Sequence, residues 1–309
     1  MIFIETIKRK INSLMTAHKQ DINSLMAAHK KEILFRFKSE LLRNAISTCK
    51  DSGITTDRIA DKGVVVSLTT YGKRLYTVSL AIESIMQGTM KPNRLILWLQ
   101  DDLKNEPLPY SLHLQMLRGL EVRYTKDIKS YKKLVPTLKL CPDSAIVTID
   151  DDALYEADTL ERLVGAYNKD PHFIYASRIR KIALNIDGSV ETYSKWENVP
   201  YGSLPSNLNL PIGKEGVLYP PGSLSEEVFD ADTFMKFCPK GDDLWFWLMA
   251  KKNKCMGSKI YTHEKFGFDS NSIGEVQDIA LYKTNISYND IMFKSLIENC
   301  QAGKYLTDN

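Results

Sequence analysis

Two groups of carboxylates are the side chains in this sequence best suited to chemistry. Asp150, Asp151 and Asp152 are consecutive and directly follow an apolar run at 144–149. Neighbouring carboxylates raise one another's pKa unless a cation offsets their charge, and Mg²⁺ or Mn²⁺ is the natural cation for oxygen ligands. Residues one apart can point the same way across a turn, so Asp150 and Asp152 form a candidate Asp-x-Asp metal pair. An acidic turn without a ligand is the alternative.

The second group is the pair Asp242 and Asp243, which precedes an apolar run at 244–248. An aspartate at a helix N-cap stabilises the helix by about 1 kcal/mol, so capping is one role for Asp242. Asp243 then lies in the first turn of the helix, where its carboxylate can face a cleft as a general base. Trp245 in the same helix is either a core residue or a platform for a sugar.

Apolar runs rich in β-branched residues predict the strands that position these acids, at 64–68, 94–99, 120–124 and 144–149. Helices are predicted after them at 75–87, 111–117, 131–140 and 157–167, and Pro136 interrupts the third. This alternation indicates βαβ units and a mostly parallel sheet flanked by helices, an α/β fold. Ligands of such sheets bind beyond the carboxyl ends of the strands, where Thr70, Asp101 and the three consecutive aspartates stand.

The pattern is less regular after residue 170. Asp187-Gly188 between apolar runs predicts a hairpin at 182–193. Residues 197–227 hold five of the 12 prolines and are predicted to form a long ordered loop, of the kind that often serves as a lid. Helices are expected again at 229–237 and 243–251.

The first 46 residues contain no Gly or Pro and hold an eleven-residue repeat, in which INSLM at 11–15 returns at 22–26. Eleven residues are close to three helical turns, so the apolar stripe stays on one face of a helix about 60 Å long. We predict a homo-oligomeric coiled coil over 1–46, a linker at 47–62 and the main domain at 63–309. An amphipathic helix on anionic lipid is one alternative, and a helix packed on its own domain is the other.

The composition excludes several classes of protein. Of the 309 residues, 43% are hydrophobic and 26% are charged, which is typical of a globular chain and not of a disordered, collagen-like or polytopic membrane protein. The net charge is only +3, so no nucleic-acid partner is expected. The five scattered cysteines form no CxxC pair, which favours a reducing compartment. We expect a cytoplasmic protein, with peripheral contact at the inner face of the membrane as a further possibility.

Three separated motifs together resemble bacterial glycosyltransferases of the GT-A fold, and most closely a family-2-like branch encoded with surface polysaccharides. The motifs are the strand and turn at 64–70, the acidic turn at 150–152 and the acidic helix start at 242. Stretches at 130–139, 216–222 and 242–245 resemble that branch more specifically. The resemblance covers 63–265 and implies a Rossmann-like GT-A domain.

By position, the resemblance implies roles for individual residues. The nucleotide-sugar site would be formed by Thr69, Thr70, Tyr71, Arg74, Asp101, Lys132, Lys133, Asp150 and Asp151. Asp152 and Asp150 would hold the metal, with His263 as a further ligand. Asp243 would be the catalytic base, next to Asp242. The acceptor side would include Trp196, Tyr219 and Trp245.

The implied activity is transfer of a sugar, with inversion, from a nucleoside diphosphate to a hydroxyl of a surface glycan of the O-antigen or capsule type. Mn²⁺ or Mg²⁺ would be the cofactor, UDP is the preferred nucleotide, and the acceptor is expected to be lipid-linked. A non-catalytic, oligomeric sugar- or nucleotide-binding scaffold is an alternative. A phosphohydrolase is a weaker one, because its Asp-x-Asp motif continues with Thr or Val two residues on, whereas Ala153 and Leu154 follow Asp152.

Overall fold

The computed structural model describes residues 2–262 and 281–306, and its centre is a seven-stranded sheet in the order β10-β5-β9-β4-β1-β2-β3. The strands are β1 (Val64–Thr69), β2 (Arg94–Gln100), β3 (Leu120–Thr125), β4 (Ala145–Thr148), β5 (Phe173–Ala176), β9 (Val217–Tyr219) and β10 (Met256–Lys259). All neighbouring pairs are parallel except those of β9, which is antiparallel to both β4 and β5. The predicted α/β class and the four predicted strands are confirmed.

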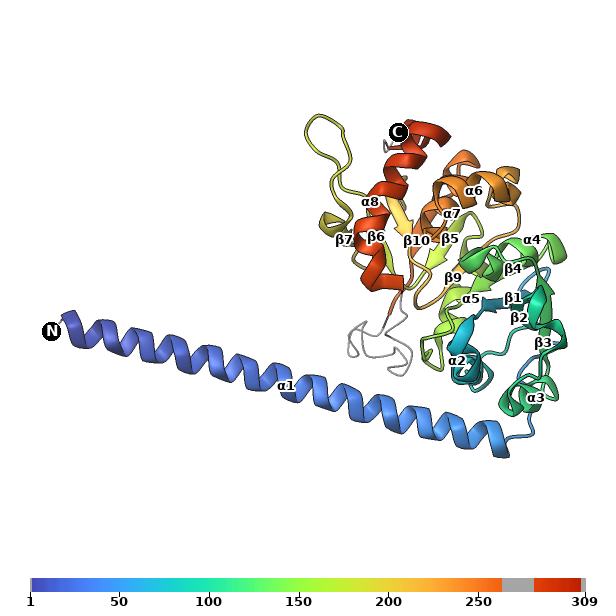
Figure 1. The fold of residues 1–309 in the computed structure, drawn as a ribbon, viewed down its shortest axis with the longest axis horizontal. Coiled ribbons are helices and arrows are strands. Elements are labelled where there is room, and N and C mark those ends of the chain that lie inside the picture. The colour runs from blue at the N-terminus through green and yellow to red at the C-terminus, as the bar shows by residue number, and fades with distance from the viewer. Residues whose placement is uncertain (1, 263–280, 307–309) are drawn as a thin grey trace.

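Helices cover both faces of this sheet (Figure 1). They are α2 (Val78–Met86), α3 (Tyr110–Met116), α4 (Val135–Leu140), α5 (Thr159–Lys169), α6 (Ala231–Phe237), α7 (Asp242–Lys252) and α8 (Leu281–Cys300). Successive side chains of a strand point to opposite faces, and accordingly Ile146 and Val147 of β4 enter two different apolar clusters. One cluster contains residues of α2, α3 and α5, and the other contains residues of α6, α7 and α8.

The order of the strands creates a switch point at the centre of the sheet. The chain runs from β1 outward to β2 and β3, and then returns to place β4 on the other side of β1. A crevice opens beyond the carboxyl ends of two such strands, because their connections leave in opposite directions. Thr69 and the aspartates after β4 therefore meet at one place.

Several local expectations need correction. The predicted helix at 131–140 is split into a 3-10 turn, η3 (Lys129–Lys133), and α4, because Pro136 near the start of α4 cannot donate a backbone hydrogen bond to η3. The predicted loop at 197–227 contains β9, and also β8 (Asn209–Pro211), which forms a small sheet with β6 (Ile179–Lys181) and β7 (Glu197–Asn198). In place of the predicted hairpin at 182–193, the structure has one isolated antiparallel bridge between Leu184 and Val190.

The N-terminal helix α1 (Ile2–Thr48) projects from the body of the molecule (Figure 1). Its last turns are part of the body, since Leu42 and Ile46 are buried against Leu80 and Leu154. The segment that follows is not a free linker, because two hydrogen bonds hold it to Arg118. The Arg118 side chain donates to the Asp51 carbonyl, and the Gly53 N–H donates to the Arg118 carbonyl. The structure describes α1 as one long helix, and its role as a coiled coil stays a prediction.

No helix among the described residues combines the length and the hydrophobicity required to cross a membrane.

Candidate active site

A cavity of about 710 Å³ lies beyond the carboxyl ends of β1 and β4, at the switch point of the sheet. Eight Lys and Arg side chains and six Asp side chains are among its lining, a formal excess of two positive charges. The predicted site residues that line it are Thr69, Thr70, Tyr71, Arg74, Lys132, Lys133, Asp150, Asp151, Asp152, Asp242 and Asp243. The tertiary fold thus brings most of the predicted catalytic, metal-binding and nucleotide-binding residues into one cavity.

Arg74 neutralises two of the three consecutive aspartates. Its Nη1 lies 2.8 Å from an oxygen of Asp151, and its Nη2 lies 3.0 Å from an oxygen of Asp152. The Thr70 hydroxyl donates to the other Asp151 oxygen at 2.6 Å. Burial raises the pKa of Asp151 to about 6, although Arg74 and the Thr70 hydrogen bond act in the opposite direction. Gly72, with φ of 55°, lets the 3-10 turn η1 (Gly72–Tyr76) bring Arg74 back over the end of β1.

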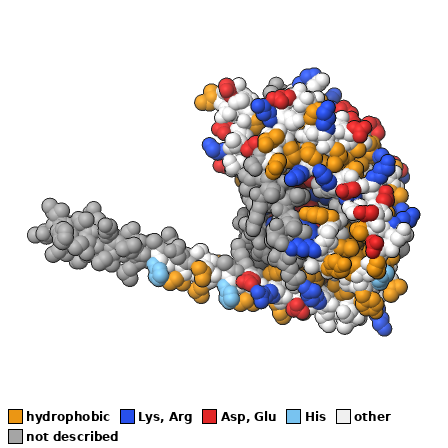
Figure 2. Space-filling view, viewed as in Figure 1, with side chains coloured by type: hydrophobic (Ala, Val, Ile, Leu, Met, Phe, Trp, Pro, Cys, Tyr) orange, Lys and Arg blue, Asp and Glu red, His pale blue; other side chains and the backbone are white. Residues whose placement is uncertain are grey.

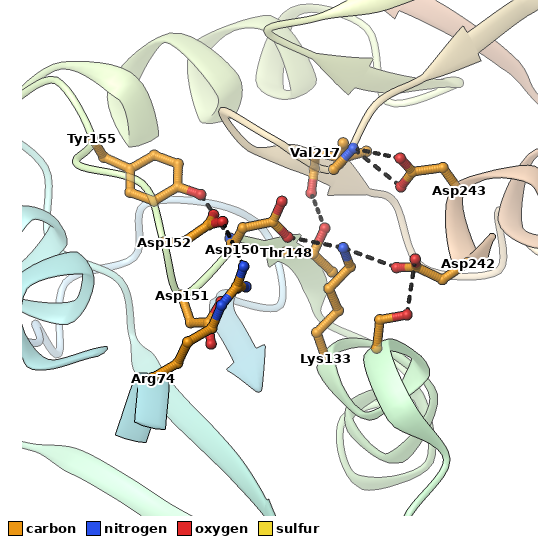
Figure 3. Close-up of polar contacts among 12 residues, drawn as sticks. Arg74, Lys133, Thr148, Asp150, Asp151, Asp152, Tyr155, Val217, Asp242 and Asp243 are labelled. Atoms are coloured by element: carbon orange, nitrogen blue, oxygen red, sulfur yellow. Dashed lines mark hydrogen bonds and ion pairs between the residues drawn. The ribbon is translucent and has the colours of Figure 1, made fainter. Parts of the chain in front are cut away.

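Lys133 joins the two carboxylate groups that the sequence places far apart. Its Nζ lies 3.0 Å from an oxygen of Asp150 and 2.9 Å from an oxygen of Asp242 (Figure 3). The other Asp242 oxygen accepts from the Ser130 hydroxyl at 3.0 Å. Burial alone lowers the pKa of Lys133, but the surrounding aspartates outweigh it and hold that pKa well above its usual range. The lysine is therefore a permanent cation at the centre of the site.

Asp243 is held differently from its neighbour. The backbone N–H of Gly213 lies 3.1 Å from each of its two carboxylate oxygens. Burial, together with the charge of Asp242, raises the pKa of Asp243 to about 7, while Lys133 lowers it. A carboxylate with such a pKa can accept a proton near neutral pH. A side chain at position 213 would force the Lys133 ammonium to move, because its Cβ would lie 2.6 Å from that nitrogen.

Arg74 and Lys133 are cations that contact the acidic turn, so a divalent ion is not the only possible counter-charge for these three carboxylates. Within residues 2–262 and 281–306, no group of three His, Cys, Asp or Glu side chains is placed to hold a metal. Asp150 and Asp152 remain a pair of carboxylates on the cavity wall, and Mg²⁺ commonly takes one or two carboxylates together with substrate phosphates. The donor set therefore suits a metal shared with a phosphorylated ligand. His263 lies outside the described residues.

The three residues predicted for the acceptor side do not line the cavity. Trp196, Tyr219 and Trp245 are all buried in the apolar cluster that contains α7, and none lines the cavity. Their large rings pack against other aromatic rings, so they have no open face for a sugar. Asp101 is exposed and also lies outside the cavity. Its neighbour Gln100, at the end of β2, lines the cavity instead.

Sequence reasoning missed a basic wall of the cavity. Arg178 and Arg180 line it from β6 and the residue before it, together with Lys214 and Lys240. Arg180 donates to the Tyr193 carbonyl at 3.2 Å and lies 4.7 Å from the centre of the Tyr193 ring. The alternation of basic residues at 178 and 180 could have predicted this basic surface, since residues two apart in a strand share a face. Lys214 could not be found locally, because it reaches the cavity through a loop between β8 and β9.

No protein-family model matches the chain, and no curated protein matches it. Among solved structures, CMP:2-keto-3-deoxy-manno-octonic acid synthetase with CTP is 9% identical, covers 63% of this chain and 87% of its own, and has a TM-score of 0.35. Residues 1–349 of S. aureus TarS are 14% identical, with coverages of 65% and 58% and a TM-score of 0.41. The Francisella tularensis 2-C-methyl-D-erythritol 4-phosphate cytidylyltransferase is 10% identical, with coverages of 74% and 98% and a TM-score of 0.41. Likeness at this distance carries no argument about activity.

Proposed function

We propose that this chain is a glycosyltransferase that moves a sugar from a nucleoside diphosphate to an acceptor hydroxyl. The observation that carries the proposal is the placement of Asp243 on the wall of a cationic cavity at the switch point of a parallel sheet. That cavity has the features of a ligand site in an α/β protein, and its lining offers both a base and cations for phosphate groups.

Asp243 is the proposed general base. The acceptor oxygen attacks the anomeric carbon while its proton passes to the Asp243 carboxylate, and the bond between that carbon and the diphosphate oxygen breaks. The electron pair of the broken bond leaves with the nucleoside diphosphate, so a single displacement inverts the anomeric configuration. The Gly213 N–H orients the carboxylate, and the pKa near 7 matches the requirement for proton transfer at neutral pH.

The donor diphosphate is proposed to lie near Arg74 and Lys133, with the nucleoside against Thr69 and Tyr71. UDP remains the preferred nucleotide. Asp150 and Asp152 would hold Mn²⁺ or Mg²⁺, which stabilises the charge that develops on a diphosphate leaving group. Arg180 and Lys214 also line the cavity, so an acceptor that carries phosphate, such as a lipid-linked glycan of a surface polysaccharide, suits its charge.

A thermal-shift screen tests the donor part of this proposal. UDP-, GDP-, CMP- and dTDP-sugars are each added with and without Mn²⁺. A ligand at about 100 times its Kd stabilises the folded state by about 2.7 kcal/mol, which raises the Tm of a chain of this length by roughly 4 °C. Asp152→Asn should reduce the shift, whereas Asp101→Asn, a matched change outside the cavity, should preserve it. A nucleotide-induced shift in Tm that is the same with and without Mn²⁺, and the same in Asp152→Asn, would contradict the proposed metal site.

Turnover separates an enzyme from a scaffold. Release of the nucleoside diphosphate should require a hydroxyl acceptor in the wild type and be lost in Asp243→Asn, while the nucleotide-induced shift in Tm persists. Binding without turnover by the wild type, over a panel of lipid-linked and free glycans, would favour a non-catalytic sugar-binding protein. The absence of any nucleotide-induced shift would refute the nucleotide site itself.

A further inference from the structure

The acidic turn that carries Asp150 and Asp152 is closed from behind by a buried tyrosine. The backbone N–H of Asp150 donates to the Tyr155 hydroxyl at 2.7 Å (Figure 3). Tyr155 is 3% exposed and belongs to the apolar cluster that contains residues of α2, α3 and α5. It does not line the cavity. Any effect of this hydroxyl on a ligand in the cavity must therefore pass through the acidic turn.

Tyr155 is itself held by two helices. Its backbone N–H donates to the Ser84 hydroxyl of α2 at 3.0 Å, and its carbonyl accepts from the Lys38 ammonium of α1 at 2.7 Å. The preceding residue, Leu154, is buried in the same apolar cluster as Leu42 of α1. The chain just after the acidic turn is thus fixed between the sheet domain and the N-terminal helix.

Lys38 differs from the residues on the projecting part of α1. The described side chains from 22 to 34 are exposed along that part (Figure 2), whereas Lys38 is half-buried. Burial lowers the pKa of Lys38, and the charge of Glu156 partly opposes this effect. Removing an ammonium from water costs free energy unless hydrogen bonds compensate it, and the Tyr155 carbonyl provides one. An apolar side chain could fill the same space without that cost, so packing alone does not account for the lysine.

The acidic turn needs support that does not depend on the ligand. Its three consecutive carboxylates repel one another, and Arg74 and Lys133 contact them from the cavity. A nucleoside diphosphate bound beside Arg74 and Lys133 would compete with the aspartates for these two cations. The contacts of Tyr155 lie behind the turn, so they persist whether or not the cavity is occupied.

We propose that Tyr155 is a positioning residue for Asp150, and that Lys38 of α1 holds Tyr155 in place for this role. The N-terminal helix then supports the site although none of its described residues lines the cavity. This inference rests on the proposed function, in which Asp150 and Asp152 hold a metal together with a nucleoside diphosphate. Removing a group that orients a metal ligand from behind typically lowers metal affinity about 10–100-fold.

Hydrogen exchange of the ligand-free chain tests the contacts directly. Tyr155→Phe removes the hydroxyl and preserves the ring, so the amides of 150–155 should exchange roughly 2–10-fold faster. Lys38→Met preserves the aliphatic stem and should accelerate exchange of the same amides. The matched controls are Tyr175→Phe, which removes another buried hydroxyl that donates to a backbone carbonyl, and Lys30→Met on the exposed part of α1. Exchange at the wild-type rate in either test variant overturns the proposal.

Titration calorimetry with UDP and Mn²⁺ tests the consequence for the site. The Kd should rise about tenfold in Tyr155→Phe and at least about twofold in Lys38→Met, and it should be unchanged in both controls. Adding Lys38→Met to Tyr155→Phe should cause little further loss, since both act through one hydrogen bond to Asp150. Faster exchange with wild-type affinity, or losses that add in the double variant, overturns the positioning role.

The positioning role and the proposed function fail in different ways. A wild type that binds no nucleotide with Mn²⁺ refutes the proposed function, whereas exchange in the ligand-free chain still decides whether Lys38 and Tyr155 fix the acidic turn. A wild type that binds UDP, with test variants that bind it equally well, refutes the positioning role alone.

Discussion

Replacing Lys133 by Met should destabilise the protein far more than replacing its neighbour Lys132. The Lys133 side chain is 7% exposed and binds Asp242, whose side chain is 10% exposed, so methionine would leave a buried carboxylate without its counter-charge. Removing one member of a buried ion pair costs about 3–5 kcal/mol. Methionine preserves most of the aliphatic stem, so the loss is mainly electrostatic.

Lys132→Met is the matched control. The Lys132 side chain is buried as well, at 2% exposure, but its partner Asp127 is 53% exposed and can be hydrated after the lysine is removed. Pairs with one well-solvated partner contribute about 1 kcal/mol or less. The two substitutions therefore differ in the exposure of the acid that each leaves behind.

Urea unfolding followed by tryptophan fluorescence measures both effects. At neutral pH the free energy of unfolding should fall by about 3–5 kcal/mol in Lys133→Met, and by about 1 kcal/mol or less in Lys132→Met. Adding Asp242→Asn to Lys133→Met should recover part of the loss, since it removes the unpaired charge. Equal losses in the two single variants, or no recovery in the double variant, would refute the assignment of Lys133 as the central cation.

Two further predictions concern the base and the loop above it. Burial raises the folded-state pKa of Asp243 to about 7 from an ordinary 3.8, so its contribution to stability is present below about pH 4 and is lost as pH rises through 7. The stability of Asp243→Asn relative to the wild type should therefore increase between about pH 4 and about pH 7. A constant difference in urea unfolding over that range would contradict this. Wild-type turnover should rise with pH through 7 for the same reason. Gly213→Ala should weaken both stability and nucleotide binding, because its Cβ would lie 2.6 Å from the Lys133 ammonium. Gly165→Ala in α5, where a Cβ meets no atom within 4 Å, should be neutral or stabilising by about 0.5–1 kcal/mol.

The order of strands and helices in the first half of the domain was predictable from local patterns. Continuous β-branched runs indicate buried parallel strands, and polar residues at their carboxyl ends indicate a binding crevice. This reasoning correctly placed Thr70 and Asp150 on one cavity wall, although they are 80 residues apart. The late pair Asp242 and Asp243 was found through its place at a helix start and through the family resemblance.

Burial and long-range pairing were not predictable in the same way. Trp196 and Trp245 are compatible with either a sugar platform or a core, and the aromatic cluster around α7 decides for the core. The insertion of β9 between β4 and β5 was hidden, because three residues in a region rich in proline carry little strand signal of their own. The position of Lys214 depends on the same insertion, since β9 begins directly after the loop that carries this lysine.

By itself, the sequence determined where the carboxylates lie along the chain. It also predicted that they lie close together beyond the carboxyl ends of the strands. Only the tertiary structure decided which cations face them, with Arg74 on Asp151 and Lys133 between Asp150 and Asp242. The reason is physical: periodicity reports which side of an element is buried, whereas an ion pair depends on the distance between side chains from different elements. That distance is set only when the sheet and its covering helices have packed together.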